Sequence, residues 1–171
     1  GNWQSGERGI ACLPGREGEF QEGVGLAIEY AKVLKCHRLN CLVGKAPQGI
    51  ASEKVRQTLL SNLRFAAMAL EKEKIRLLIE PLNHQDIPGF YLVHTQDALQ
   101  LFKEIGHPNL WLQYDVYHMQ VMEGNLTKTI SNNLSRIAHI QIADNPGRHE
   151  PGTGEINFTN LFRFIDEAGY D

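Results

Sequence analysis

The order of apolar and amphipathic segments is the feature that most constrains the fold of this chain. Four short apolar runs alternate with segments whose apolar residues recur at helical spacing, and these runs are Leu39–Val43, Ile75–Ile79, Leu110–Asp115 and Ala138–Ile142. Short buried strands separated by amphipathic helices are typical of a parallel sheet whose strands are connected through helices. The pattern therefore predicts an α/β fold with a parallel sheet covered by helices.

The segments between the apolar runs predict five helices, over residues 19–35, 52–73, 95–105, 126–137 and 159–168. Ser52 and Thr95 suit the N-cap positions of their helices, and Gly106 suits a helix end. Two loops, 84–94 and 144–157, are long and contain Gly and Pro. Long loops in such folds often carry the binding site.

Composition narrows the classes of ligand. The chain has 171 residues, of which 42% are hydrophobic, and 17 Lys and Arg residues stand against 20 Asp and Glu residues for a net charge of −3. Without a basic cluster, we expect no nucleic-acid partner. No apolar run approaches the roughly 18 residues of a membrane span. We therefore expect a small-molecule ligand and no membrane association, and a homo-oligomer remains compatible with the sequence.

The three cysteines form an odd set without a Cys-x-x-Cys pair. Neither a disulfide framework nor a zinc ribbon is indicated by this set. A reducing compartment, the cytoplasm, fits best.

Polar side chains stand where three successive strands end. Glu80 follows the second apolar run, Asp115 closes the third, and His139 and Gln141 share one face of the fourth. In α/β folds the carboxyl ends of parallel strands meet at the edge where ligands bind. We therefore expect Glu80, Asp115 and Gln141 to lie close together.

Carboxylates at short range repel one another, so such a cluster needs a shared proton or a cation. A set of oxygen ligands suits Mg²⁺ or Mn²⁺ better than zinc. Any one of these residues alone is more often a helix cap or an ion-pair partner, but the recurrence on three strands favours a metal site. His139 is equally compatible with a satisfied core histidine, and Asp144 with capping of the following loop.

Arg148 lies in the loop that follows the fourth strand, among glycines and prolines that restrict its backbone. A guanidinium beside a metal centre can hold a substrate carboxylate through two hydrogen bonds. An exposed loop arginine without such a role is the alternative reading of this residue.

These segments together resemble the hydroxypyruvate isomerase family, within the xylose isomerase-like TIM barrel superfamily. That superfamily also contains other sugar and ketoacid isomerases and the metal-dependent abasic-site endonucleases. The resemblance covers essentially the whole chain, and its motifs are Gly6–Ile10, Leu42–Lys45, Leu78–Asn83, Gln113–Gln120, His139–Asp144, Gly147–Arg148 and Gly152–Asn157.

The resemblance implies a (β/α)₈ barrel with one divalent metal ion, Mg²⁺ or Mn²⁺, at its carboxyl face. It implies interconversion of hydroxypyruvate and tartronate semialdehyde by metal-assisted proton transfer through an enediolate. Glu80, Asp115 and Gln141 would be the metal ligands, and Glu80 would also accept or donate a proton. His118 and Arg148 match positions near substrate oxygens, and Arg148, with His118 or Lys45, would hold the substrate carboxylate.

Three alternatives stay open. Another ketoacid or sugar isomerase of the same family, such as a 2-oxo-tetronate isomerase, would use the same residues. A nuclease of the abasic-site type would want several histidine ligands and a basic surface, whereas this chain has Gln141 and a net charge of −3. An inactive fragment is the third alternative.

Chain length bears on that last alternative. A TIM barrel usually needs about 250 residues, so residues 1–171 are expected to form a single partial barrel domain. The resemblance implies that this part extends from about strand 4 to helix 7. Sites of the family that the chain resembles also contain a second catalytic Glu on the last strand of the barrel. No residue of this chain matches that Glu. We expect it at the end of an apolar strand within roughly ten residues after Asp171, because catalytic residues of barrels lie at strand carboxyl ends.

Overall fold

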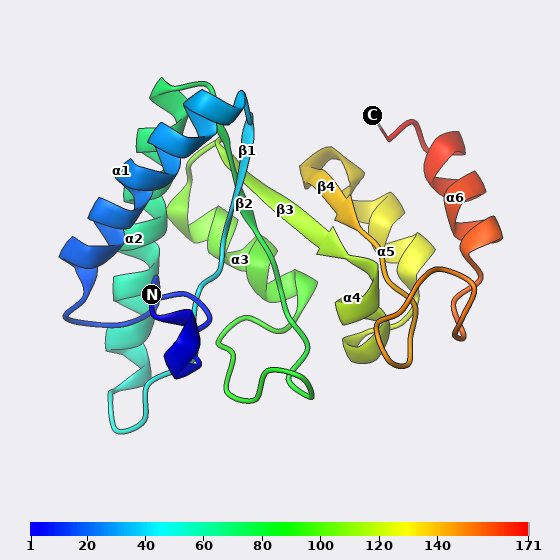
Figure 1. Ribbon diagram of the computed structural model, residues 1–171, viewed down its shortest axis with the longest axis horizontal. Helices are drawn as coiled ribbons and strands as arrows, with labels where there is room; N and C mark the ends of the chain where they lie inside the picture. Colours follow the sequence, from blue (N-terminus) through cyan, green and yellow to red (C-terminus); the bar gives the residue numbers. More distant parts are fainter. Residues whose placement is uncertain (171) are drawn as a thin grey trace.

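The computed structural model describes residues 1–170, and its strands and helices alternate along the chain as the sequence predicts (Figure 1). The four strands form one parallel sheet in the order β1-β2-β3-β4. Their bounds are β1 Arg38–Cys41, β2 Arg76–Ile79, β3 Leu110–Asp115 and β4 Ile137–Gln141. The predicted parallel α/β architecture is therefore confirmed.

Six helices connect or flank the strands: α1 Glu17–Leu34, α2 Ser52–Lys72, α3 Thr95–Ile105, α4 Val116–Met122, α5 Leu126–Asn133 and α6 Phe158–Glu167. Two 3₁₀ turns, Trp3–Ser5 and Leu134–Arg136, complete the regular structure. Helices α1, α2 and α3 pack in sequence along the sheet (Figure 1). None of the helices in residues 1–170 combines the length and the apolar character needed to cross a membrane.

The hydrophobic core lies between the sheet and its helices. Because strand side chains alternate between the two faces, Leu77 and Ile79 of β2 and Leu112 of β3 join the core with apolar residues of α2 and α3. The opposite face carries Gln113 and Asp115. The strands thus separate an apolar helix side from a polar side that leads to the site.

A register shift in the last strand pair sets which β4 side chains reach the polar face. Leu112 pairs with Ile137, whereas the next residue, Gln113, pairs with His139. Ala138 is therefore the extra residue of a β-bulge. The bulge aligns His139 with Gln113 and Gln141 with Asp115.

The structure corrects several predicted element boundaries. The first strand is Arg38–Cys41 rather than Leu39–Val43, and the second and fourth begin and end within one residue of the prediction. The fifth predicted segment, 126–137, is helical only to Asn133 and then tightens into a 3₁₀ turn. Differences at helix ends are common, because helix ends fray and their last turn is often a 3₁₀ turn.

Helix caps and one whole helix also differ from the prediction. Ser52 and Thr95 are the first helical residues, and neither Ala51 nor His94 before them makes a side-chain cap. Helix α4 has no amphipathic signature, since its first four residues, Val116–Met119, are all buried. A seven-residue helix whose whole first turn is buried cannot be recognised from hydrophobic periodicity.

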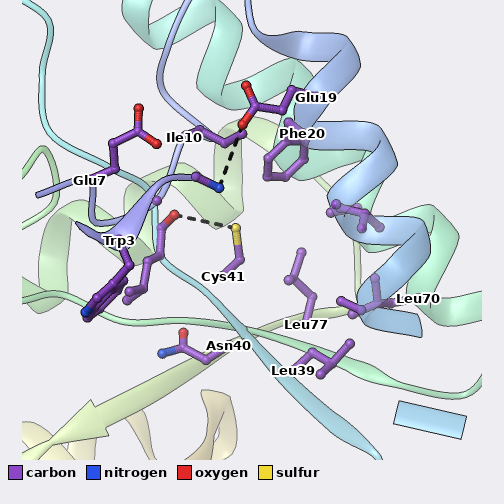
Figure 2. A pocket seen from close by; sticks show the side chains of 17 residues that line it. Trp3, Glu7, Ile10, Glu19, Phe20, Leu39, Asn40, Cys41, Leu70 and Leu77 are labelled. Atoms are coloured by element: carbon purple, nitrogen blue, oxygen red, sulfur yellow. Dashed lines mark hydrogen bonds and ion pairs between the residues drawn. The ribbon is translucent and has the colours of Figure 1, made fainter. Parts of the chain in front are cut away.

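Within the described residues, β1 pairs only with β2, so its other side is an edge of the sheet. A cavity of about 300 Å³ lies beside this strand, between the Trp3–Ser5 turn and α1 (Figure 2). Phe20, Leu39 and Leu77 line it with apolar groups, and Glu7 and Glu19 lie at its rim. The sheet therefore has the open edge that part of a barrel presents.

Candidate metal centre and substrate cavity

The three residues predicted as metal ligands meet at the carboxyl edge of the sheet. Glu80 directly follows β2, and Asp115 and Gln141 are the last residues of β3 and β4. Glu80 and Asp115 are buried, and Gln141 is half-buried and paired in register with Asp115. The alternation of strands and helices therefore brings these three residues to one edge, and their role as metal ligands stays a prediction.

Asp115 has two roles: one of its carboxylate oxygens caps a helix, and the other lies at the site. Its Oδ1 accepts hydrogen bonds from the backbone N–H groups of Tyr117 at 2.9 Å and His118 at 3.2 Å, which caps helix α4. Its Oδ2 faces Arg148 Nη2 at 3.3 Å and His118 Nε2 at 3.6 Å. The cap fixes the carboxylate through one oxygen and leaves the other for the site.

Glu80 lies next to this carboxylate in a buried environment. Burial and the negative charge of Asp115 raise the pKa of Glu80 to about 7, against the hydrogen bond from Asn40 Nδ2 to its Oε2 at 2.5 Å. A carboxyl group with a pKa near neutrality is suited to accept and return a proton. The pair of carboxylates is also the arrangement that a cation would stabilise.

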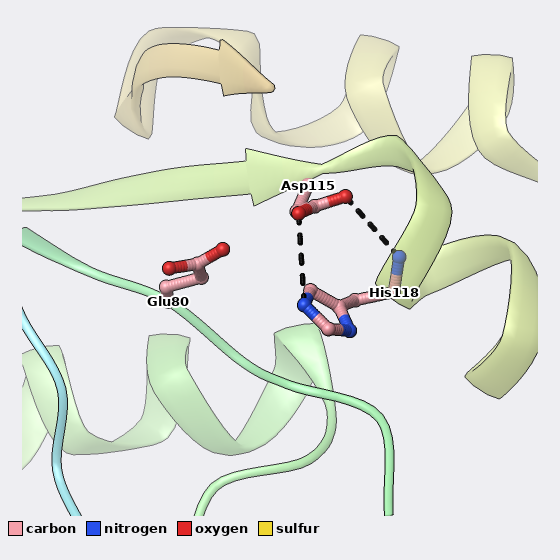
Figure 3. Close-up of side chains that lie close together, drawn as sticks. All are labelled: Glu80, Asp115 and His118. Atoms are coloured by element: carbon pink, nitrogen blue, oxygen red, sulfur yellow. Dashed lines mark hydrogen bonds and ion pairs between the residues drawn. The ribbon is translucent and has the colours of Figure 1, made fainter. Parts of the chain in front are cut away.

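The geometry fits a metal ion. Ligand atoms of Glu80, Asp115 and His118 all lie within 4.8 Å of one another, and the three side chains surround one space (Figure 3). Gln141 Oε1 accepts a hydrogen bond from Gln113 Nε2 at 2.8 Å, and a second lone pair of that amide oxygen is left for a cation. Glu80, Asp115 and Gln141 offer oxygen atoms only, the donor type that Mg²⁺ and Mn²⁺ prefer.

His118 is buried beside these oxygens, and its hydrogen bonds define its tautomer. Asn83 donates to His118 Nδ1 from its backbone N–H at 3.2 Å and from its side-chain Nδ2 at 2.8 Å. Asp86 fixes the orientation of that amide, because Asp86 N donates to Asn83 Oδ1 and Asp86 Oδ2 accepts from Asn83 Nδ2. Nδ1 is thus an acceptor, so the proton of the neutral ring lies on Nε2.

Burial lowers the pKa of His118, which keeps the ring neutral. Its Nε2 has no hydrogen-bond partner among the described residues. A neutral ring that carries its proton on Nε2 donates a hydrogen bond toward the site and does not bind a metal through that atom. This favours His118 as a substrate contact over His118 as a metal ligand.

The loop after β4 is organised around Asp144. Its carboxylate accepts hydrogen bonds from four backbone N–H groups, those of Asn145, Gly152, Gly154 and Ile156, at 2.8–3.1 Å. These hydrogen bonds, which oppose the effect of burial, hold the pKa of Asp144 below its ordinary value of 3.8. Capping of the loop by Asp144, the role expected from the sequence, is confirmed.

Arg148 extends from this loop to the site. Its guanidinium lies 3.3 Å from Asp115 Oδ2 and 5.3 Å from the centre of the Tyr117 ring, while 42% of its side chain is exposed. Arg148 therefore reaches the edge of the sheet where the carboxylates lie, the position that an arginine needs in order to contact a substrate there.

His139, the other candidate on β4, is half-buried and paired in register with Gln113.

A cavity of about 430 Å³ opens in front of these groups. Glu80, His118, Gln141 and Arg148 line it, together with Trp3, Arg8 and Asn40, to which the sequence reasoning gave no role. In the sequence, Arg8 is distinguished only by its position in the Gly6–Ile10 motif. Lys45, named earlier as a partner for Arg148, is not among the described residues that line this cavity.

The fold is part of a parallel barrel, and two buried carboxylates lie at the carboxyl ends of its strands. These features are typical of barrel proteins that bind a metal ion at the strand ends. Residues 5–171 match the family described as "Xylose isomerase-like TIM barrel". The chain belongs to this family.

Two relatives that cover the whole chain carry the names of isomerases. Hydroxypyruvate isomerase of Escherichia coli (strain K12) is 57% identical over 171 residues, which are 100% of this chain and 66% of that protein. The 2-oxo-tetronate isomerase of Cupriavidus necator is 43% identical with the same coverage. The chain thus spans about two thirds of the length of the curated relatives it matches.

A solved structure shares the fold closely. The crystal structure titled AP endonuclease, family 2, from Brucella melitensis has a TM-score of 0.95 and 40% identity, and the match covers 99% of this chain and 66% of that chain. A D-allulose 3-epimerase from Methylomonas sp. has a TM-score of 0.79 at 23% identity over 92% of this chain and 55% of its own, which supports the barrel fold alone.

Proposed function

We propose that the protein interconverts hydroxypyruvate and tartronate semialdehyde by proton transfer between adjacent carbons. The observation that carries this proposal is the buried pair Glu80 and Asp115 at the carboxyl edge of the sheet, where Glu80 also lines the cavity. The identity to an isomerase of this name supports the choice of substrate. The protein is then a small-molecule enzyme, and its free cysteines fit a cytoplasmic location.

In the proposed reaction, Glu80 removes a proton from C3 of hydroxypyruvate, and the electrons form an enediolate over C2 and C3. A proton returns to C2, and the hydroxyl proton on O3 passes to O2, which gives the aldehyde at C3. Without a bound cation the pKa of Glu80 is raised to about 7, and a cation held by this carboxylate would make Glu80 a weaker base. The return of the proton to C2 requires an acid–base group on the other side of the substrate.

Glu80, Asp115 and Gln141 would hold a divalent cation, Mg²⁺ or Mn²⁺. When bound, such an ion supplies Lewis-acid stabilisation of negative charge that develops on substrate oxygens. His118 donates its Nε2–H to a substrate oxygen, a role that its hydrogen bonds from Asn83 prepare. Arg148, held at Asp115, supplies a further donor to the same oxygens.

The test is proton exchange catalysed by the complete protein. With Mn²⁺ or Mg²⁺ in deuterated water, the C3 position of hydroxypyruvate should exchange and tartronate semialdehyde should accumulate, as followed by NMR. Removal of the metal with EDTA should stop both processes, and its return should restore them. If exchange is absent with both ions, the proposed function is wrong. Exchange that persists unchanged in EDTA would contradict the part assigned to the metal.

Two other activities have specific support. The 43% identical relative named 2-oxo-tetronate isomerase favours a four-carbon acid, and kcat/KM for each acid with the same preparation decides between the two substrates. The similar structure titled AP endonuclease favours cleavage of abasic DNA. Salt-sensitive cleavage of an abasic duplex, without isomerisation of either acid, would support the nuclease instead.

A further inference from the structure

Arg8 reaches the cavity from a part of the chain far from the strand ends. It follows the Trp3–Ser5 turn and lines the cavity that also contains Glu80, Gln141 and Arg148. Its Nη1 donates to the carbonyl oxygens of Glu7 at 2.9 Å and Trp3 at 3.4 Å. Among the described residues, neither its Nε nor its Nη2 has a hydrogen-bond partner, and no carboxylate forms an ion pair with it.

The other arginine of the cavity differs in this respect, because Arg148 is paired with Asp115 at 3.3 Å. Arg16, close to Arg8 in the sequence, also has acidic partners, Glu7 and Glu19. A half-buried guanidinium without a carboxylate partner is an incomplete ion pair that favours an anion. In this cavity, Arg8 is the cation whose charge is still available.

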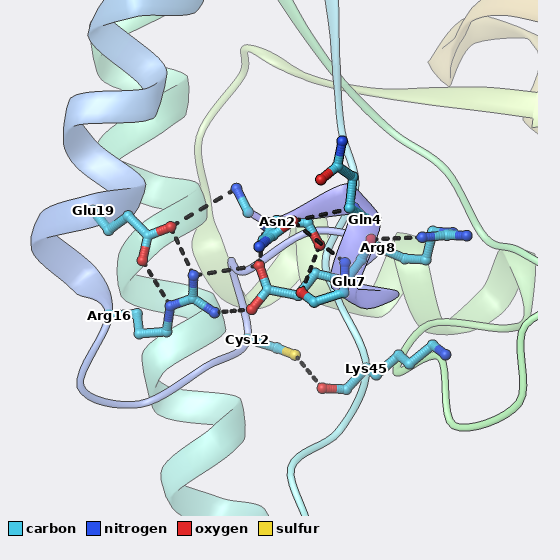
Figure 4. A network of polar contacts seen from close by, with 10 residues as sticks. Asn2, Gln4, Glu7, Arg8, Cys12, Arg16, Glu19 and Lys45 are labelled. Carbon is cyan, nitrogen blue, oxygen red and sulfur yellow. Dashed lines mark hydrogen bonds and ion pairs between the residues drawn. The ribbon is translucent and has the colours of Figure 1, made fainter.

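The guanidinium of Arg8 is held in place before any ligand binds. It lies 4.0 Å from the centre of the Trp3 ring, a cation–π distance. The carboxylate of Glu7, directly before Arg8, is bound by Arg16 and by the backbone N–H of Asn2, and Arg8 extends away from this cluster (Figure 4).

On the other side of Arg8, Gly9 forms a bridge to Val43. A Cβ at Gly9 would lie 1.8 Å from the carbonyl oxygen of Leu42, and the φ of Gly9 is +97°, so no other residue fits this contact. Arg8 therefore lies between two anchored neighbours. Such preorganisation lowers the entropy that a ligand would otherwise lose on ordering the side chain.

We propose that Arg8, supported by Trp3, binds the carboxylate of the substrate and makes the site selective for 2-oxo acids over neutral sugars. This inference rests on the proposed isomerase function. It assigns the two arginines different tasks: Arg148 contacts the oxygens near Asp115, and Arg8 neutralises the carboxylate at the other end of the molecule.

The test compares an acid with its neutral counterpart in the complete protein and in Arg8→Gln. Dihydroxyacetone has the skeleton of hydroxypyruvate with a hydroxymethyl group in place of the carboxylate. For hydroxypyruvate, Arg8→Gln should raise KM about 10- to 100-fold, because a charge-assisted hydrogen bond is lost. For isomerisation of dihydroxyacetone, kcat/KM of Arg8→Gln should stay within about twofold of the wild-type value.

Binding of D-glycerate, which lacks the carbonyl group and cannot isomerise, is measured by calorimetry in parallel. Its affinity should fall about 10- to 100-fold in Arg8→Gln and less in Arg8→Lys, which keeps the charge. Arg163→Gln, on the exposed side of α6, removes the same charge far from the cavity and should leave both readouts unchanged.

Equal losses for the acid and the neutral substrate, or unchanged D-glycerate affinity in Arg8→Gln, would overturn the assignment. If the wild-type protein isomerises no acid, the proposed function fails, and the D-glycerate measurement still decides the role of Arg8.

Discussion

Glu80 and Asp144 are both buried carboxylates at the carboxyl edge of the same sheet, yet their surroundings differ. Glu80 faces another carboxylate, Asp115, and receives one side-chain amide hydrogen bond from Asn40. Asp144 receives four backbone N–H groups. The pKa of Glu80 is accordingly raised to about 7, whereas that of Asp144 is held below 3.8.

The comparison shows what distinguishes a carboxylate that can exchange a proton or bind a cation from one that only stabilises the structure. Where backbone donors saturate the oxygens, the negative charge is stabilised and the group organises the chain around it. Where donors are few and a like charge is near, the group can exchange a proton or bind a cation. Both residues are carboxylates that follow a strand, so these properties do not distinguish them. The number of backbone N–H donors around each carboxylate does.

The largest expected effect is on activity at Glu80. Glu80→Gln should lower the rate of C3 proton exchange about 10³-fold, because the amide cannot accept the proton. The melting temperature of the metal-free protein should stay the same or rise, since the substitution removes one of two adjacent buried charges. Exchange assays and thermal unfolding measure the two effects. Exchange within tenfold of wild type would remove Glu80 from its role.

Next in size is the effect on metal affinity at Gln141. Gln141→Ala should weaken Mn²⁺ binding about tenfold, and Asp115→Ala should weaken it more, because a charged ligand is lost. Calorimetric titration measures both affinities. His139→Ala, two residues earlier on the same strand, is the matched control and should bind as wild type does. Unchanged affinity in Gln141→Ala would contradict its assignment as a ligand.

A smaller effect, on stability, is expected at Asp144. Asp144→Asn should lower the melting temperature by several degrees, because an amide cannot accept all four N–H groups and directs its own N–H toward them. Circular dichroism on heating measures the change, and Asp166→Asn on the exposed side of α6 is the control. If Asp144→Asn unfolds as wild type does, the loop does not depend on this carboxylate.

The smallest expected effects are the pH dependences. For Asp144, whose pKa is lowered, the stabilisation is present above its ordinary pKa of 3.8 and is lost as the pH falls below it. For Glu80, whose pKa is raised from 4.5 to about 7, the metal-free protein should lose stability as the pH rises through this interval. Urea midpoints from pH 3 to 8, compared with those of Asp144→Asn and Glu80→Gln, resolve the two contributions. Parallel curves for wild type and both variants would contradict this expectation.

Much of the architecture follows from sequence patterns, because strand and helix periodicities differ and parallel strands end at a common edge. This logic placed Glu80, Asp115 and Gln141 together. It could not reveal the bulge at Ala138, which depends on pairing between β3 and β4. Nor could it find Arg8, which no periodic segment contains and which reaches the cavity through contacts between distant parts of the chain.

The polar support of His118 was missed for a similar reason. Asn83 lies 35 residues from His118 in the sequence, and its backbone N–H has no sequence signature. Asp115, by contrast, was correctly placed, although its second function as the cap of α4 was hidden because α4 itself carries no amphipathic pattern. Side-chain roles that depend on backbone donors are thus the hardest to predict.

Asp115 both caps helix α4 and lies at the site, so local unfolding of the first turn of α4 is coupled to ligand binding at the site. Its Oδ1 holds the first turn of α4 while its Oδ2 lies 3.3 Å from Arg148 Nη2, so opening of that turn releases the carboxylate. A ligand that binds only the closed form must shift this equilibrium by mass action. The amide protons of Tyr117 and His118 should therefore exchange with solvent more slowly as the site fills, which makes the first turn of α4 an internal reporter of binding.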